Sequence, residues 1–186
     1  MVDNSTPLHL IILGVLALGG CRSPEQGTAE GQQQPHVETA TFGRNAPFTI
    51  DGTLITLVDG VSEAPTQTSS TRTTTRYLGP ESEGDLNGDG LNDLAFWILQ
   101  DAGGSGTFYY VVVALRTGTG YTTTDAFLVG DRITPQFLQV RADAQELHVN
   151  FADRKSNEPM ATPPSEPKVL ILETTSDGRL MGLMSQ

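Results

Sequence analysis

The sequence predicts an all-β domain, a sandwich or partly open barrel of roughly eight to ten short antiparallel strands behind an extended N-terminal tether. Two observations lead to this class. Between residues 47 and 186, short apolar or alternating segments recur, separated by turns rich in Gly, Asp and Pro. No segment there has the apolar spacing of an amphipathic helix. The segments do not repeat at a fixed period, so we do not expect a propeller built from this chain alone.

The first strands of the domain are marked by their turns and by their composition. Residues 48–58 are typical of two short strands joined at Asp51-Gly52, a dipeptide that favours a tight hairpin turn. The Thr-rich stretch 71–76 suits an edge or outward-facing strand, because Thr is β-branched and tolerates a half-exposed position.

The centre of the domain is expected to be a pair of buried strands. Residues 94–99 and 108–115 are apolar almost throughout, as in strands covered on both faces. The Gly-rich segment 103–107 between them favours a flexible hairpin connection over a phosphate loop or nucleophile elbow, because it lacks the residues that either motif needs. Further strands are expected at 121–129, 133–141, 146–151, 168–174 and 180–183. Within 146–151, alternation places His148 on the face opposite the apolar residues.

The N-terminal part of the chain indicates export and lipidation. Residues 10–18 are apolar or small and too short to span a bilayer, and Leu18-Gly19-Gly20-Cys21 follows. This pattern resembles the bacterial lipoprotein signal. The resemblance implies cleavage after residue 20, diacylglycerol on the Cys21 sulfur and acylation of the new N-terminus. Two or more acyl chains make a stable membrane anchor.

The resemblance divides the chain into a signal peptide at 1–20, a lipidated Cys21 with a flexible tether at 21–46, and a β domain at 47–186. The tether has a polar composition with few apolar residues. The expected location is the cell envelope, with the membrane as partner through the lipid on Cys21. Arg22 in place of Asp favours the outer membrane in a cell that has one.

The charge of the chain argues against one class of partner, and its cysteine content excludes one kind of cross-link. The formal net charge is −11, from 22 acidic and 11 basic residues. A surface this acidic argues against nucleic-acid binding through a basic patch. Cys21 is the single cysteine, so no intramolecular disulfide can form.

One short acidic loop stands out as a candidate metal site. Oxygen-bearing side chains occur there at alternating positions, with one skip, at Asp85, Asn87, Asp89 and Asp93. A tight loop with this spacing can wrap carboxylate and amide oxygens around a hard cation such as calcium. Its glycines, Gly88 and Gly90, allow the backbone angles that such a wrap requires.

The loop follows only the first part of an EF-hand pattern. Counted from Asp85, Gly90 is the glycine at the sixth position and Leu91 offers its carbonyl at the seventh. The twelfth position is Phe96 instead of a bidentate Glu, so Asp93 must complete the ligand set. An apolar strand follows where an EF-hand has its exit helix.

The pattern Asp-x-Asn-x-Asp-Gly-x-x-Asp before an apolar strand resembles the calcium loops of integrin-type (FG-GAP-like) repeats. That resemblance implies a structural calcium between two strands, with Asp85, Asn87, Asp89, Asp93 and the Leu91 carbonyl as ligands. Segments 103–112, 128–133, 152–155 and 158–160 also resemble a family of uncharacterised bacterial envelope proteins with an N-terminal anchor. This second resemblance implies a location in the cell envelope and a calcium loop. The family has no established activity that could be carried over.

The signals for catalysis are few. Only His36 and His148 remain after signal cleavage, and His36 lies in the tether. With the lipoprotein and calcium-loop resemblances, this favours a membrane-anchored lipoprotein whose calcium-stabilised β domain is a non-enzymatic structural or binding module of the envelope. An extracytoplasmic hydrolase that uses the loop carboxylates is the alternative, and it predicts a cleft beside the loop. A third possibility is an adhesion module in which calcium bridges to a ligand carboxylate. A protein or glycan partner is not identified by the sequence.

Overall fold

The computed structural model describes residues 41–65, 71–79, 81–104 and 106–183, all of which belong to one compact unit, Gln33–Gln186. This part of the chain folds into thirteen strands in three sheets, and all named strands pair antiparallel. Its helical residues form a single turn at 41–43. The all-β prediction is therefore confirmed, with more strands than the roughly eight to ten expected from the turn signals.

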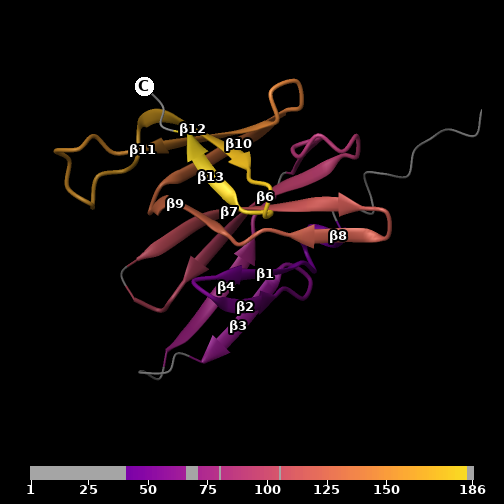
Figure 1. The fold of residues 1–186 in the computed structure, drawn as a ribbon. Helices are drawn as coiled ribbons and strands as arrows, with labels where there is room; N and C mark the ends of the chain where they lie inside the picture. The colour runs from indigo at the N-terminus through magenta and orange to yellow at the C-terminus, as the bar shows by residue number, and fades with distance from the viewer. Residues whose placement is uncertain (1–40, 66–70, 80, 105, 184–186) are drawn as a thin grey trace, which may run out of the picture. The chain divides into compact units, whose positions relative to one another are not determined.

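In chain order the strands are β1 (Pro47–Ile50), β2 (Thr53–Thr56), β3 (Val61–Pro65), β4 (Arg72–Tyr77), β5 (Ser82–Gly84), β6 (Asp93–Asp101), β7 (Thr107–Thr117), β8 (Gly120–Thr123), β9 (Phe127–Asp131), β10 (Thr134–Arg141), β11 (Glu146–Asp153), β12 (Glu166–Thr174) and β13 (Leu180–Leu183) (Figure 1).

The seven-stranded sheet is built around the hairpin of β6 and β7. Its main path runs β3-β4-β6-β7-β8, and β5 and β9 pair with β6 and β7 beside that path. Each of the two central strands therefore pairs, on the side away from the other, with two different strands along its length. β6 pairs with β5 near Asp93 and with β4 near its end, and β7 pairs with β9 and then β8. The second sheet has the order β10-β11-β12-β13, and β1 and β2 form a separate hairpin.

The β6–β7 pair is buried on both faces, as its continuous apolar sequence predicts. Ala95 and Trp97 point into one cluster with buried side chains of β10, β11 and β12, which we call the sandwich core. Leu94, Phe96 and Ile98 alternate to the opposite face and pack with β1 in a second cluster, which we call the hairpin core. Each fully buried side chain of this size contributes about 1.5–3 kcal/mol of hydrophobic stabilisation.

The second sheet also follows its sequence pattern. Leu147, Val149 and Phe151 of β11 are buried in the sandwich core, whereas His148 lies on the opposite face of the strand. His148 Nε2 there lies 2.8 Å from Glu146 Oε2. The prediction that His148 faces away from the core is therefore confirmed.

The structure agrees with the predicted β1–β2 turn and differs in part from the prediction for the Thr-rich strand. Asp51 and Gly52 adopt positive φ values of 48° and 77° in the predicted β1–β2 turn. Of the two alternatives for 71–76, the edge strand is wrong, because β4 pairs with β3 on one side and with β6 on the other. The outward-facing alternative agrees with the strand's mostly exposed or half-buried residues. The edge is formed by β3, whose sequence, VSEAP, has no regular apolar alternation.

The packed domain begins a few residues before Pro47. Ala46 is fully buried in the hairpin core and Phe42 packs against it. The Arg44 carbonyl accepts a hydrogen bond from the Gly60 N–H at 2.7 Å. The end of the segment that we assigned to the tether is therefore attached to the β domain. The predicted signal peptide and Cys21 lie outside the described residues. Within the described ranges, no helix is long and apolar enough to cross a membrane.

Candidate functional site

The acidic loop, residues 85–92, connects β5 to β6 at one end of the seven-stranded sheet. Gly84 and Asp93 are paired in register, so the two ends of the loop are held side by side by the strand ladder. A side chain at position 84 would collide with the second sheet, because an added Cβ would lie 2.6 Å from Val140 Cγ1 of β10. The loop therefore begins at a point where β5 lies directly against β10.

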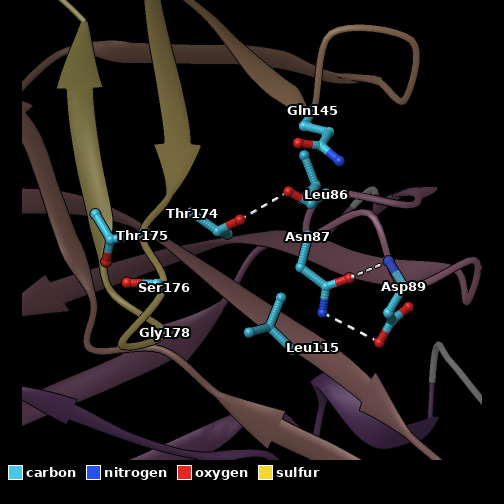
Figure 2. Close-up of a pocket in the computed structure, with 9 residues that line it drawn as sticks. All are labelled: Leu86, Asn87, Asp89, Leu115, Gln145, Thr174, Thr175, Ser176 and Gly178. Atoms are coloured by element: carbon cyan, nitrogen blue, oxygen red, sulfur yellow. Dashed lines mark hydrogen bonds between the residues drawn. The ribbon is translucent and has the colours of Figure 1, made fainter.

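Leu86 fixes the loop to both sheets. Its side chain is 1% exposed and lies in the sandwich core. Its carbonyl accepts a hydrogen bond of 2.7 Å from Thr174 Oγ1 at the end of β12 (Figure 2). An otherwise polar loop is thus anchored by one apolar side chain and by one hydrogen bond from the four-stranded sheet.

Asp93 is a buried carboxylate that connects the loop to β7. Its side chain is fully buried, Oδ2 accepts the Leu86 N–H at 2.8 Å, and Oδ1 accepts the Arg116 N–H at 2.8 Å. Burial raises the pKa of Asp93, and the nearby carboxylates of Asp89 and Asp85 raise it further, against the lowering effect of the two N–H donors. The fold therefore holds a negative charge here at an electrostatic cost.

Asp85 closes the first part of the loop on itself. Its Oδ1 accepts the Gly88 N–H at 2.6 Å and its Oδ2 accepts the Gly90 N–H at 2.8 Å. These backbone donors, with Gly90 as the largest contribution, lower the pKa of Asp85. Gly88 and Gly90 have φ values of 79° and 82°, in the left-handed region that their sequence positions predict.

Asn87 and Asp89 form the exposed rim of the loop. Asn87 Oδ1 accepts the Asp89 N–H at 3.0 Å, and Asn87 Nδ2 donates to Asp89 Oδ2 at 3.2 Å (Figure 2). Asp89 Oδ1 accepts the Leu91 N–H at 2.8 Å. All four predicted side-chain ligands therefore accept backbone N–H groups within the described structure.

This arrangement brings the predicted ligands near one another without directing them at one point. Among the described residues, no group of three or more His, Cys, Asp or Glu side chains is placed to share a metal ion. The physical reason is that the oxygens of Asp85 and Asp93 face backbone donors. An oxygen that accepts one N–H keeps a second lone pair for a cation, so these hydrogen bonds are compatible with metal binding.

The charge around the loop fits a cation. Three carboxylates belong to the loop and its closing strand, and no basic side chain in the described part of the chain forms an ion pair with them. Arg116, whose backbone N–H bonds to Asp93, directs its side-chain Nη1 to the Tyr121 hydroxyl at 3.1 Å. The donor set, three carboxylates and one amide, is the chemistry that calcium prefers.

An open pocket of about 420 Å³ lies beside the loop, and we call it the loop pocket. It is lined by Leu86, Asn87, Asp89, Leu115, Gln145, Thr174, Thr175, Ser176 and Gly178 (Figure 2). The sequence reasoning did not identify the last five of these residues. They come from the β10–β11 turn, from the end of β12 and from the β12–β13 turn, and only the strand pairing places these segments beside the loop.

Comparison with protein-family models, with curated proteins and with solved structures finds no match for this chain. The resemblances to envelope proteins and to FG-GAP-like loops therefore stay predictions.

Proposed function

We propose that this protein is a lipid-anchored module of the bacterial cell envelope whose β domain is stabilised by calcium bound at the acidic loop. Asp85, Asn87, Asp89, Asp93 and the Leu91 carbonyl would hold the ion, and Cys21 would carry the lipid. The observation that carries the proposal is the buried Asp93 carboxylate beside two further carboxylates with no basic side chain paired to them.

Calcium would act on the structure through charge and through the loop's two attachments. A divalent cation would offset the repulsion among the three carboxylates, which otherwise opposes the loop conformation. Leu86 and Asp93 connect the loop to the sandwich core and to β7, so ordering the loop would hold this end of the two sheets together. Calcium sites of extracellular modules bind at about 10⁻⁴–10⁻³ M, which suits an envelope location.

A structural role is better supported than hydrolysis. Of the residues that line the loop pocket, Asp89 is the single carboxylate, whereas glycoside hydrolysis generally requires a pair. Asp85 and Asp93 use their oxygens to hold backbone N–H groups. The cavity that the hydrolase alternative requires lies beside the loop, but its lining lacks the second carboxylate that such a reaction would need.

Thermal unfolding of the full chain in detergent, with calcium and with a chelator, tests the calcium claim. Calcium at a hundred times its dissociation constant should stabilise the fold by about 2.7 kcal/mol. Asp89→Ala should remove most of this response, and Asp143→Ala, an exposed carboxylate outside the loop, should retain it. An equal response in the wild-type chain and Asp89→Ala would contradict the proposal.

The anchor is tested separately from the metal site. The wild-type chain should partition with the membrane fraction of the cell, and Cys21→Ser should release it into the aqueous fraction, because the thioether-linked lipid can no longer form. A wild-type chain found in the aqueous fraction would rule out the lipid as the anchor, whatever the calcium measurement shows.

A further inference from the structure

The loop pocket is formed by three turns that are distant in the sequence. Asn87 and Asp89 come from the acidic loop, Gln145 from the β10–β11 turn, and Thr174 with Ser176 from the end of β12 and the turn that follows (Figure 2). Loops gathered at one end of a β sandwich are a common place for binding sites. The volume of about 420 Å³ lies within the range of about 300–1,000 Å³ found for small-molecule pockets.

The lining excludes two broad classes of ligand. It contains no Lys, Arg or His, so an anionic ligand would meet the Asp89 carboxylate without a compensating positive charge. It contains two apolar residues, Leu86 and Leu115, and the Leu86 side chain is already buried in the sandwich core. A large apolar ligand would therefore leave the polar groups of the pocket without partners.

The polar groups of the pocket match a ligand that carries hydroxyl groups. The pocket is lined by two amides and three hydroxyls, each of which carries both donor and acceptor atoms: Asn87, Gln145, Thr174, Thr175 and Ser176. The hydroxyl protons of Thr174 and Thr175 already bond within the protein, so these two groups would meet a ligand as acceptors. A sugar hydroxyl likewise donates and accepts, so it can pair with groups of this kind. The half-buried Leu115 at the base of the pocket can contact the apolar C–H face of a sugar ring.

Several of these groups are held in position before any ligand binds. Thr174 Oγ1 donates to the Leu86 carbonyl, and Thr175 Oγ1 accepts the Arg179 N–H at 3.1 Å. Asn87 and Asp89 hold each other through two hydrogen bonds. Polar groups that are already ordered lose little conformational entropy on binding.

We propose that the loop pocket binds a neutral saccharide. The inference shares Asn87 and Asp89 with the proposed calcium loop and otherwise does not depend on it. Because the lining holds no aromatic side chain on which a sugar ring could stack, the affinity for a single short saccharide is expected to be weak, in the millimolar range.

Amide chemical-shift mapping of the full chain in detergent micelles tests the proposal. The probes are maltotriose and tri-N-acetylchitotriose as neutral saccharides, butylamine as a cation and glycerol phosphate as an anion. We expect at least one saccharide to shift the amides of Asn87, Gln145 and Ser176 in a saturable manner. The proposal is overturned if neither saccharide shifts them, or if butylamine shifts them at lower concentration than either saccharide.

Matched variants separate the pocket from the rest of the surface. Ser176→Trp fills the pocket from an exposed position and should weaken saccharide binding about tenfold or more, the equivalent of about 1.4 kcal/mol. Ser156→Trp, at an exposed position in another loop, should leave it unchanged. Gln145→Ala and Gln139→Ala form a second pair, in which only the first should weaken binding.

The calcium response distinguishes failure of this inference from failure of the proposed function. Ser176→Trp should keep the calcium-dependent stabilisation, because Ser176 lies outside the acidic loop. Saccharide binding that is equal in Ser176→Trp and Ser156→Trp would place the saccharide elsewhere and refute the pocket assignment, whether or not calcium binds.

Discussion

Replacing Asp93 with Ala should destabilise the domain even without any metal. The substitution removes the acceptor of two backbone N–H groups, those of Leu86 and Arg116, at distances of 2.8 Å each. The bond to the Leu86 N–H is buried, and the bond to the Arg116 N–H is partly buried. The loss therefore exceeds that of an ordinary surface hydrogen bond.

The expected magnitude follows from the burial of the two bonds. Each donor that is left unsatisfied in a buried place costs about 1–3 kcal/mol, so two give about 2–6 kcal/mol. The bond to Leu86 is buried and the bond to Arg116 is partly exposed to water, and the variant also removes a buried negative charge. Both effects reduce the loss, and we expect about 2–4 kcal/mol in the free energy of unfolding.

Urea denaturation of the full chain in the presence of a chelator measures this loss. Asp93→Asn keeps an acceptor for one of the two donors and should lose about half as much as Asp93→Ala. Asp101→Ala, at the exposed end of the same strand, should change stability by less than about 0.5 kcal/mol. A loss below about 1 kcal/mol in Asp93→Ala would refute the assignment of Asp93 as the link between the loop and β7.

Two further predictions concern the same end of the domain and the β7–β9 ladder. Leu86→Ala should lower the free energy of unfolding by about 2–5 kcal/mol because the side chain is 1% exposed in the core, and Leu54→Ala, at 69% exposure, should change it little. A small effect of Leu86→Ala would show that the loop is not anchored. Burial raises the pKa of Asp131, but the Thr107 N–H and the Arg132 guanidinium outweigh it and lower the pKa overall. The ionised Asp131 side chain therefore stabilises the fold fully above its unfolded pKa of about 3.9, and this contribution is lost as pH falls through its lower folded pKa. Asp131→Asn should lower the free energy of unfolding at neutral pH and make it fall less as the pH is lowered. A variant with the same pH dependence of unfolding as the wild-type chain would contradict this.

Much of the fold could be predicted because its strongest patterns are local. Continuous apolar residues at 94–99 predict a strand covered on both faces, and the alternation around His148 predicts a strand with one buried face. The short strands β3 and β5 have no such pattern. Their sequences, VSEAP and SEG, are polar or mixed, and their strand pairing depends on the neighbours β4 and β6. Composition alone therefore could not tell whether β4 lies at an edge or faces outward within the sheet.

The sequence predicts a tight acidic loop, and the structure adds the contacts that this loop makes with the rest of the domain. The spacing from Asp85 to Asp89 predicts oxygen ligands in a tight loop, and the glycine φ values agree with it. The contact by which Asp93 links the loop to β7 is made with the Arg116 N–H, which lies 23 residues further along the chain. The loop pocket likewise requires Gln145 and Thr174 to be brought to the loop by the sheets. Such long-range contacts leave no local pattern in the sequence.

Isothermal titration of calcium into the metal-free full chain tests the central claim most directly. We expect one ion per chain, and we expect Asp85→Ala and Asp89→Ala each to abolish binding while Asp143→Ala leaves it intact. Calcium binding with the same stoichiometry and affinity in all three variants, or no binding by the wild-type chain at millimolar calcium, would contradict the assignment of the acidic loop as a calcium site.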